Sequence, residues 1–143
     1  MSCVFCDIIA ERQTAHVVYR DRHSLAILDH RPLFPGHLLL LPLEHYGTLA
    51  DLPFALLEPF FSAAQRLARA VESGLGAEGT FVAINNRVSQ SVPHVHVHVV
   101  PRTKGDGLRG FFWPRHKYRD DSHMKEVCGL IKQALKADAS ERS

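Results

Sequence analysis

The sequence predicts an α+β protein in which two main helices pack on an antiparallel five-stranded sheet. Five short segments carry the apolar patterns of strands, and two longer segments carry apolar residues at the three- and four-residue spacing of helices. Strands and helices do not alternate regularly, which argues against a parallel βαβ sheet. The chain has 143 residues, and we expect a single domain over residues 1–143.

The five expected strands differ in their patterns. A run of leucines in the third strand indicates burial on both faces of the sheet, whereas the fifth strand alternates histidine with valine. A polar turn separates the first two strands. The expected ranges are 16–20, 25–29, 36–42, 80–85 and 94–101, or 93–101 when the proline that leads into the last strand is counted.

Each expected helix carries one apolar stripe. Pro59 is unfavourable inside the first helix, so we expect this helix to begin later than its stripe suggests or to kink, and to end at Gly74 and Gly76. The first stripe consists of Leu57, Phe60, Phe61, Ala64, Leu67, Ala68 and Val71. The last helix is expected over about residues 121–137, with 138–143 frayed and an irregular segment at 105–118. Its stripe consists of Met124, Val127, Cys128, Ile131 and Leu135.

Composition excludes several classes of protein. The formal net charge of +2 is too small to predict a nucleic-acid-binding protein. The longest apolar run, residues 38–41, is too short for a membrane span, and the N-terminus lacks the pattern of a secretory signal. Three cysteines, an odd number, favour free thiols or metal ligands over disulfides. We therefore expect a cytoplasmic protein.

Three histidines in the fifth strand are the most informative feature of the sequence. Because side chains two residues apart share one face of a strand, His94, His96 and His98 should line up while the intervening valines turn to the core. Three interpretations compete: an exposed histidine-rich strand, a metal site with neutral imidazole ligands, or phosphoryl chemistry with one imidazole as nucleophile. The regularity of the triplet disfavours the first.

The segment from His94 to Val100 matches the H-φ-H-φ-H-φ-φ signature (φ apolar) of the histidine triad superfamily of nucleotide hydrolases and transferases. Other segments resemble that family in order and spacing. These are Asp29 followed by Pro32-Leu33-Phe34-Pro35-Gly36-His37, and Gln90-Ser91-Val92 before the triad. The likeness covers residues 3–104 and suggests a bacterial-type member with the HIT-like fold. Pro101-Arg102 and Lys104-Gly105-Asp106 resemble the fragile histidine triad branch.

The resemblance implies a catalytic mechanism. His96 would attack an α-phosphate to form a nucleotidyl-histidine, which water then hydrolyses. His98 would donate to the same phosphate, and His94 and His37 would support the triad. The substrate would be a purine nucleotide derivative, such as a dinucleoside polyphosphate, a nucleoside phosphoramidate or an aminoacyl-adenylate. No cofactor is expected to be required for catalysis.

The resemblance also assigns substrate contacts. Asp29 would accept hydrogen bonds from the ribose hydroxyls, because a carboxylate can accept from two donors. Gln90, Ser91 and Asn85 would contact the phosphate or the leaving group. The loop of residues 86–89 departs from the glycine-rich version found in several relatives. An apolar base pocket would consist of Phe5, Ile8 and Ile27.

The pair Cys3 and Cys6 forms a C-x-x-C motif, which alone also fits a redox pair or two buried thiols. Many bacterial members that this chain resembles hold zinc with such a pair and two histidines. The resemblance therefore implies a structural zinc at Cys3, Cys6, His45 and His94.

Two further points concern partners and rival functions. A homodimer through the first long helix and an adjoining strand is expected by resemblance, although Leu57, Phe60, Phe61 and Leu67 would equally suit an internal core. The segment Phe111-Phe112-Trp113-Pro114-Arg115 would cover the leaving-group side or pack on a partner. The rival functions are a metal-dependent hydrolase with the triad histidines as ligands, and a nucleotide-binding or scaffold protein with little catalysis.

Overall fold

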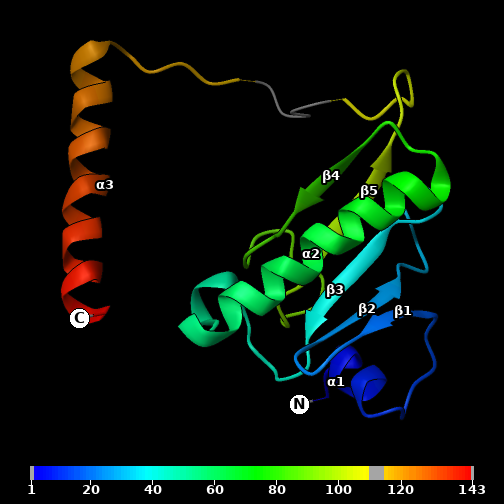
Figure 1. Cartoon of the computed structure of the whole chain (residues 1–143). Helices are drawn as coiled ribbons and strands as arrows, with labels where there is room; N and C mark the ends of the chain where they lie inside the picture. Colours follow the sequence, from blue (N-terminus) through cyan, green and yellow to red (C-terminus); the bar gives the residue numbers. More distant parts are fainter. Residues whose placement is uncertain (1, 110–114, 143) are drawn as a thin grey trace. The chain divides into compact units, whose positions relative to one another are not determined.

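The computed structural model describes residues 2–109 and 115–142 (Figure 1). The predicted α+β class and the antiparallel five-stranded sheet are confirmed, with strand order β1-β2-β3-β5-β4. The strands are β1 (Val17–Arg20), β2 (Ser24–Leu28), β3 (Leu38–Pro42), β4 (Gly79–Ala83) and β5 (Val97–Arg102). The helices are α1 (Val4–Ile9), α2 (Phe54–Leu75) and α3 (Asp121–Arg142), with a 3-10 turn at Leu49–Asp51.

The chain divides into two compact units, residues 1–106 and 107–143. All five strands, α1 and α2 belong to the first unit, and α3 belongs to the second. This division differs from the single domain expected over residues 1–143. The helix α3 extends to Arg142, beyond the expected end at residue 137. Residues 111–114 of the aromatic segment lie outside the described part of the chain.

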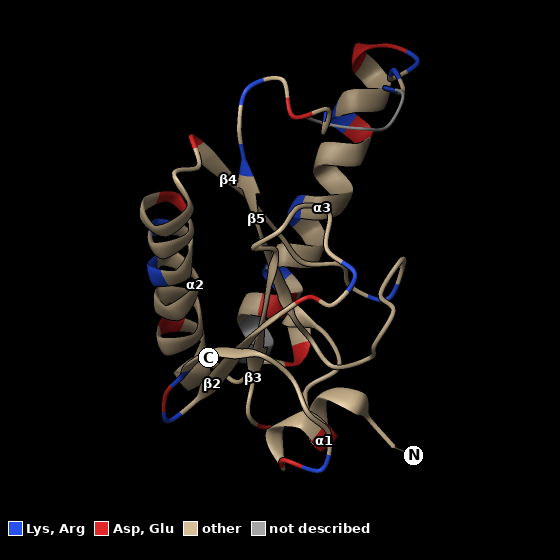
Figure 2. Cartoon of the chain, turned by 90° about the vertical axis from the view of Figure 1, so that its right-hand side faces the viewer, with Lys and Arg blue, Asp and Glu red and all other residues tan. Residues whose placement is uncertain are grey.

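Two layers of apolar packing cover the two faces of the sheet, with α2 on one side and α1 on the other (Figure 2). Leu38 and Leu40 of β3 pack in the cluster that includes α2, whereas Leu39 and Leu41 pack in the cluster that includes Phe5 of α1. The alternation of side chains along a strand explains this division. The prediction that β3 is buried on both faces is therefore confirmed. Within the described residues, no helix has the length and apolar character needed to cross a bilayer.

The helix α2 begins at Phe54, before its apolar stripe, whereas Pro59 led us to expect a later start or a kink. Pro59 lies in the second turn, where its missing N–H deprives only one carbonyl near the helix start of its usual partner. At the other end, Gly76 adopts a left-handed φ of 67° as the C-cap, and Gly74 remains inside the helix. The face toward the sheet buries Phe60, Ala63, Ala64, Leu67 and Val71. Phe61, by contrast, is 39% exposed.

The strand β5 begins at Val97, whereas the sequence predicted a strand from residue 93 or 94. In the antiparallel register, Val97 faces Leu40 of β3, which brings Pro42 opposite Val95. Because Pro42 has no N–H, it cannot donate to the ladder at that point. The Val95 N–H instead donates to the carbonyl of Tyr46 at 2.7 Å. The first two triad histidines therefore lie on irregular backbone that enters the strand.

Gly36 allows the connection between β2 and β3 to pack closely against the end of α2. Its φ of +98° is a conformation that residues with a Cβ rarely adopt, and a Cβ there would overlap Leu75 Cδ1. Gly74, in contrast, has open space around its Cα.

We expect Gly36→Ala to lower the free energy of unfolding by about 1–3 kcal/mol, because alanine is strained at this φ. As the matched control, Gly74→Ala should raise it by roughly 0.5–1 kcal/mol, because alanine is the better helix former. Urea denaturation of the two variants and the wild type measures both changes. Equal stability of Gly36→Ala and the wild type would contradict the packing described.

Candidate functional site

A cleft of about 1040 Å³ opens on the α1 side of the sheet. Its apolar wall includes Phe5, Ile8 and Ile27, the three residues predicted to hold a base. The polar lining of the cleft includes Asp29, Ser91, His96 and His98. The structure thus brings two of the triad histidines to the same space as the predicted base and ribose contacts.

The triad alternation places valines and histidines on opposite sides, as predicted. Val95, Val97 and Val99 are fully buried in the cluster that includes α2. His94 and His96 are also buried, at 0% and 3% exposure, on the other side of the chain. An exposed histidine-rich strand is therefore excluded for these two residues.

One hydrogen bond determines which nitrogen of His96 carries the proton. The Nδ1 atom of His96 lies 2.8 Å from the main-chain carbonyl oxygen of His94. A carbonyl only accepts, so Nδ1 must be the donor. In the neutral ring, Nε2 is then left with a free lone pair. His96 lines the cleft, and its unprotonated nitrogen is the one available to a ligand.

A chain of hydrogen bonds likewise sets the tautomer of His98. The Leu33 N–H donates to His37 Nδ1 at 3.1 Å, which leaves the proton of His37 on Nε2. That Nε2 lies 3.0 Å from His98 Nδ1 and donates to it. His98 therefore keeps its own proton on Nε2, and the residue lines the cleft. The arrangement offers a lone pair at His96 and an N–H donor at His98.

Burial lowers the pKa of His98 and of His37. Desolvation lowers the pKa of His98 to about 4, with smaller contributions from the neighbouring His96 and His37. Desolvation also lowers the pKa of His37, although the nearby Asp29 opposes the shift. Both rings are therefore uncharged at neutral pH, which the hydrogen-bond chain requires because His98 Nδ1 must accept.

Asp29 directly follows β2, and its main-chain N–H donates to the His37 carbonyl at 2.9 Å. One carboxylate oxygen accepts from the Arg31 N–H at 2.9 Å, and the other lies 3.7 Å from His37 Nε2. The carboxylate retains further lone pairs and is among the residues that line the cleft.

Asn85 and Gln90, both predicted to contact substrate, do not line the cleft. The side chain of Gln90 is occupied within the protein: its Oε1 accepts from the Arg87 N–H at 2.7 Å, and its Nε2 donates to the Gly47 carbonyl at 2.7 Å. Gln90 thus connects the loop before the triad to the segment after β3. Ser91, the next residue, does line the cleft.

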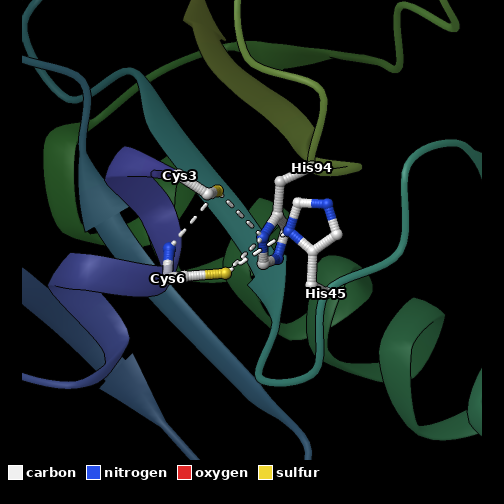
Figure 3. Close-up of side chains that lie close together, drawn as sticks. All are labelled: Cys3, Cys6, His45 and His94. Atoms are coloured by element: carbon white, nitrogen blue, oxygen red, sulfur yellow. Dashed lines mark hydrogen bonds between the residues drawn. The ribbon is translucent and has the colours of Figure 1, made fainter. Parts of the chain in front are cut away.

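Four side chains predicted to hold zinc converge at the end of the triad away from His98 (Figure 3). The ligand atoms of Cys3, Cys6, His45 and His94 all lie within 4.8 Å of one another. Cys6 Sγ is 3.3 Å from His45 Nδ1 and 3.6 Å from His94 Nδ1. Tetrahedral zinc with bonds of about 2.0–2.3 Å places its ligands about 3.3–3.8 Å apart, so the donor set fits this ion.

The tautomer of His94 also fits a metal ligand. Its Nε2 lies 3.0 Å from the carbonyl oxygen of Pro42 and must donate to it. The lone pair is consequently on Nδ1, which faces the two sulfur atoms (Figure 3). Burial, with the hydrogen bond and charge of Cys3, raises the pKa of the Cys6 thiol.

The triad histidines do not together form a metal site. Among the described residues, the side chains whose ligand atoms converge are the Cys3 cluster and the group Asp29, His37 and His98. The hydrogen bond between His37 and His98 already accounts for the second group. This observation counts against a hydrolase that uses His94, His96 and His98 as its metal ligands.

Several cleft residues were not predicted from the sequence. Leu39 could have been found, because it lies two residues after His37 and so shares its face of the sheet. His16, His30 and Arg31 also line the cleft. Nothing in their local pattern distinguishes them from ordinary exposed polar residues.

Comparison with known proteins gives a consistent result. The family model described as the HIT domain matches residues 10–105. An uncharacterized HIT-like protein of Mycobacterium tuberculosis is 44% identical over 110 residues, 76% of each chain. The crystal structure of a HIT family member from Bacillus subtilis superposes with a TM-score of 0.84 at 29% identity, covering 93% of this chain and 96% of that one.

Three other similar proteins carry informative names. A zinc-bound histidine triad family protein from Mycobacterium smegmatis is 37% identical, with a TM-score of 0.72 and coverage of 94% and 98%. Adenylylsulfatase HINT3 of Arabidopsis thaliana is 29% identical over 93% of this chain and 69% of its own length. An asymmetrical bis(5'-nucleosyl)-tetraphosphatase of Schizosaccharomyces pombe is 34% identical over 64% of this chain and 52% of its own.

The family match over residues 10–105 includes all five strands, and the structural match covers 93% of the chain. His96, His98 and Ser91 line one cleft, and His37 contacts His98. The chain belongs to the histidine triad family of HIT-domain proteins.

Proposed function

We propose that this protein is a nucleotide hydrolase or transferase that cleaves at the α-phosphate of a purine nucleotide derivative. The observation that carries the proposal is the tautomer of His96, whose Nδ1–H is held by the His94 carbonyl at 2.8 Å. The free Nε2 lone pair of a buried residue that lines the cleft is suited to nucleophilic attack. The hydrolase names of two relatives agree with this chemistry.

In the first step, His96 Nε2 forms a bond to the α-phosphorus while the bond from phosphorus to the leaving group breaks. The product is a nucleotidyl-histidine, and the electron pair of the broken bond departs with the leaving group. His98, neutral with its proton on Nε2, donates to a phosphate or leaving-group oxygen where negative charge increases. Water then attacks the same phosphorus, which releases the nucleoside monophosphate and restores His96.

The remainder of the cleft binds the nucleoside. The apolar wall of Phe5, Ile8 and Ile27 packs against the base, which provides little hydrogen-bond discrimination between purines. Asp29 accepts from the ribose hydroxyls, and Ser91 contacts the phosphate. The leaving group, whether phosphate chain, amine or carboxylate, extends from the triad end of the cleft.

A structural zinc at Cys3, Cys6, His45 and His94 accompanies this function. The convergent donor set and the zinc-bound relative support it. When bound, the ion would cross-link α1, the segment after β3 and the start of the triad. It supplies no step of the reaction. Zinc ligation needs Cys3 and Cys6 as reduced thiols, which is consistent with the cytoplasmic location expected from the sequence.

We also propose a homodimer. The sequence left open whether Phe60 and Leu67 serve an internal core or a dimer. Both are buried inside the subunit, at 1% and 3% exposure. Apolar surface nevertheless remains on α2 and on β4, which is an edge strand of the sheet. Phe61 is 39% exposed and Val82 is 46% exposed. An unpaired edge strand beside exposed apolar residues favours pairing between subunits.

The dimer is tested by sedimentation of the full chain at micromolar concentration, where we expect a species of twice the monomer mass. Val82→Lys should shift it toward monomer, because a charge on the edge strand disfavours pairing. Only monomer in the wild type would refute the pairing.

The enzymatic activity is tested by AMP release from a panel of an adenosine phosphoramidate, an aminoacyl-adenylate mimic and two diadenosine polyphosphates. We expect turnover of at least one substrate, and a loss of about a thousandfold or more in His96→Ala because the nucleophile is removed. A chelator present only during the assay, too briefly to remove zinc from the Cys3 cluster, should leave the reaction intact, since no metal takes part in the bond-making step.

Two other results would change the assignment. If no substrate is turned over but nucleotides bind, the protein is a binding or scaffold protein. If a chelator abolishes turnover at once while the zinc content of the Cys3 cluster is unchanged, another metal takes part in the chemistry.

The stability of the protein should depend on pH through His98. Its folded pKa of about 4 lies below the unfolded value of roughly 6.5, so between these values the unfolded chain binds more protons. The free energy of unfolding should therefore fall as the pH decreases from 6.5 to 4. We expect His98→Asn, which does not titrate, to show a smaller fall over this range in urea denaturation. Parallel pH profiles of the two proteins would contradict a neutral, buried His98.

A further inference from the structure

His94 belongs to two sites at once. Its imidazole Nδ1 faces Cys3 and Cys6, each at 3.6 Å, whereas its main-chain carbonyl holds the Nδ1–H of His96. Its Nε2 is fixed on the carbonyl of Pro42. Any change in the position of the His94 main chain therefore moves the acceptor that orients the His96 ring.

The second connection passes through Phe5, which lies between the two cysteines in α1. The ring of Phe5 is 5% exposed and meets the ring of His96 edge-on, with centroids 5.1 Å apart. It meets the ring of His94 in the same way at 5.8 Å. Because Phe5 lies between Cys3 and Cys6 in the sequence, the positions of these two cysteines determine where the Phe5 ring packs against His96.

The third connection starts from His45. The next residue, Tyr46, accepts the N–H of Val95 with its carbonyl at 2.7 Å, and Val95 lies between the two histidines. The residues that would hold one ion are therefore connected to the main chain of His94 and of Val95 and, through Phe5, to the ring of His96. This backbone precedes β5, so the sheet ladder does not fix it.

We propose that occupancy of the cluster of Cys3, Cys6, His45 and His94 by a divalent cation positions the His96 ring for attack. Cys3, Cys6 and His45 are then positioning residues of the reaction in addition to stabilising the fold. The inference rests on the proposed function. Because a displacement of about 1 Å at a reacting group can cost a hundredfold in rate, loss of the ion should affect the chemical step more than nucleotide binding.

The principal variant is His45→Ala, because His45 is the exposed member of the cluster and its removal leaves no cavity in the core. His45→Cys restores a fourth zinc ligand of a different type and serves as the rescue. Cys128→Ser removes a thiol from exposed surface of α3 and serves as the control. Zinc content is measured for each full-length protein, together with its melting temperature.

Two measurements test the positioning. The first is the rate of nucleotidyl-histidine formation in a single turnover, compared with the Kd for AMP. In His45→Ala we expect a rate roughly ten to a hundredfold lower with a Kd within about threefold of the wild type. The second is the ¹⁵N spectrum of the His96 ring in the free protein, assigned with His96→Ala. Zinc-loaded wild type should show the Nδ1–H tautomer alone, and His45→Ala a mixture of tautomers.

Rescue of both readouts in His45→Cys, with no change in Cys128→Ser, is the expected result. A zinc-poor His45→Ala that melts earlier but keeps the wild-type rate and a single tautomer would overturn the proposal and leave the cluster purely structural. If His45→Ala does not fold, wild-type protein stripped of zinc and then reloaded decides through the same readouts, and a wild-type rate and a single tautomer in the folded, zinc-free protein would likewise overturn it. If loaded wild type turns over no substrate, the proposed function fails, and the tautomer spectra still decide the positioning.

Discussion

The chemistry of the cleft depends on the hydrogen bond from His96 Nδ1 to the carbonyl of His94. An imidazole attacks phosphorus only through an unprotonated nitrogen, and this bond leaves Nε2 as that nitrogen. A main-chain carbonyl suits the task because it does not titrate. The carbonyl is available because β5 begins only at Val97, so the backbone before it is not committed to the sheet ladder. The irregular entry into the strand is thus a condition of the proposed mechanism.

Alternation along the sheet made much of the site predictable from the sequence. His96 and His98 share a face because they are two residues apart, and Leu39 shares the face of His37 for the same reason. The beginning of β5 was not predictable from its own residues. Val95 donates to the carbonyl of Tyr46, and the Pro42 carbonyl at the end of β3 accepts from His94, so the contacts at this point come from residues about fifty positions earlier. A local pattern contains no information about such a partner.

The loop before the triad illustrates a second limit. Gln90 was predicted to contact substrate because it stands at a polar position next to the triad, but its amide is used by Arg87 and Gly47. Arg87 and Ser89 adopt left-handed φ values of 68° and 60°, which glycine normally occupies. A loop with these residues needs internal hydrogen bonds to keep its shape. Gln90 provides them, and so determines where Ser91 enters the cleft.

The three triad histidines show how one residue type acquires three different tasks from its hydrogen-bond partners. The carbonyl of Pro42 takes the Nε2 proton of His94, which directs a lone pair toward the cysteines. The carbonyl of His94 takes the Nδ1 proton of His96, which directs a lone pair into the cleft. His37 donates to His98, which leaves an N–H there instead. Burial lowers the pKa of His98, and the row thus presents in sequence the groups proposed here as metal ligand, nucleophile and donor.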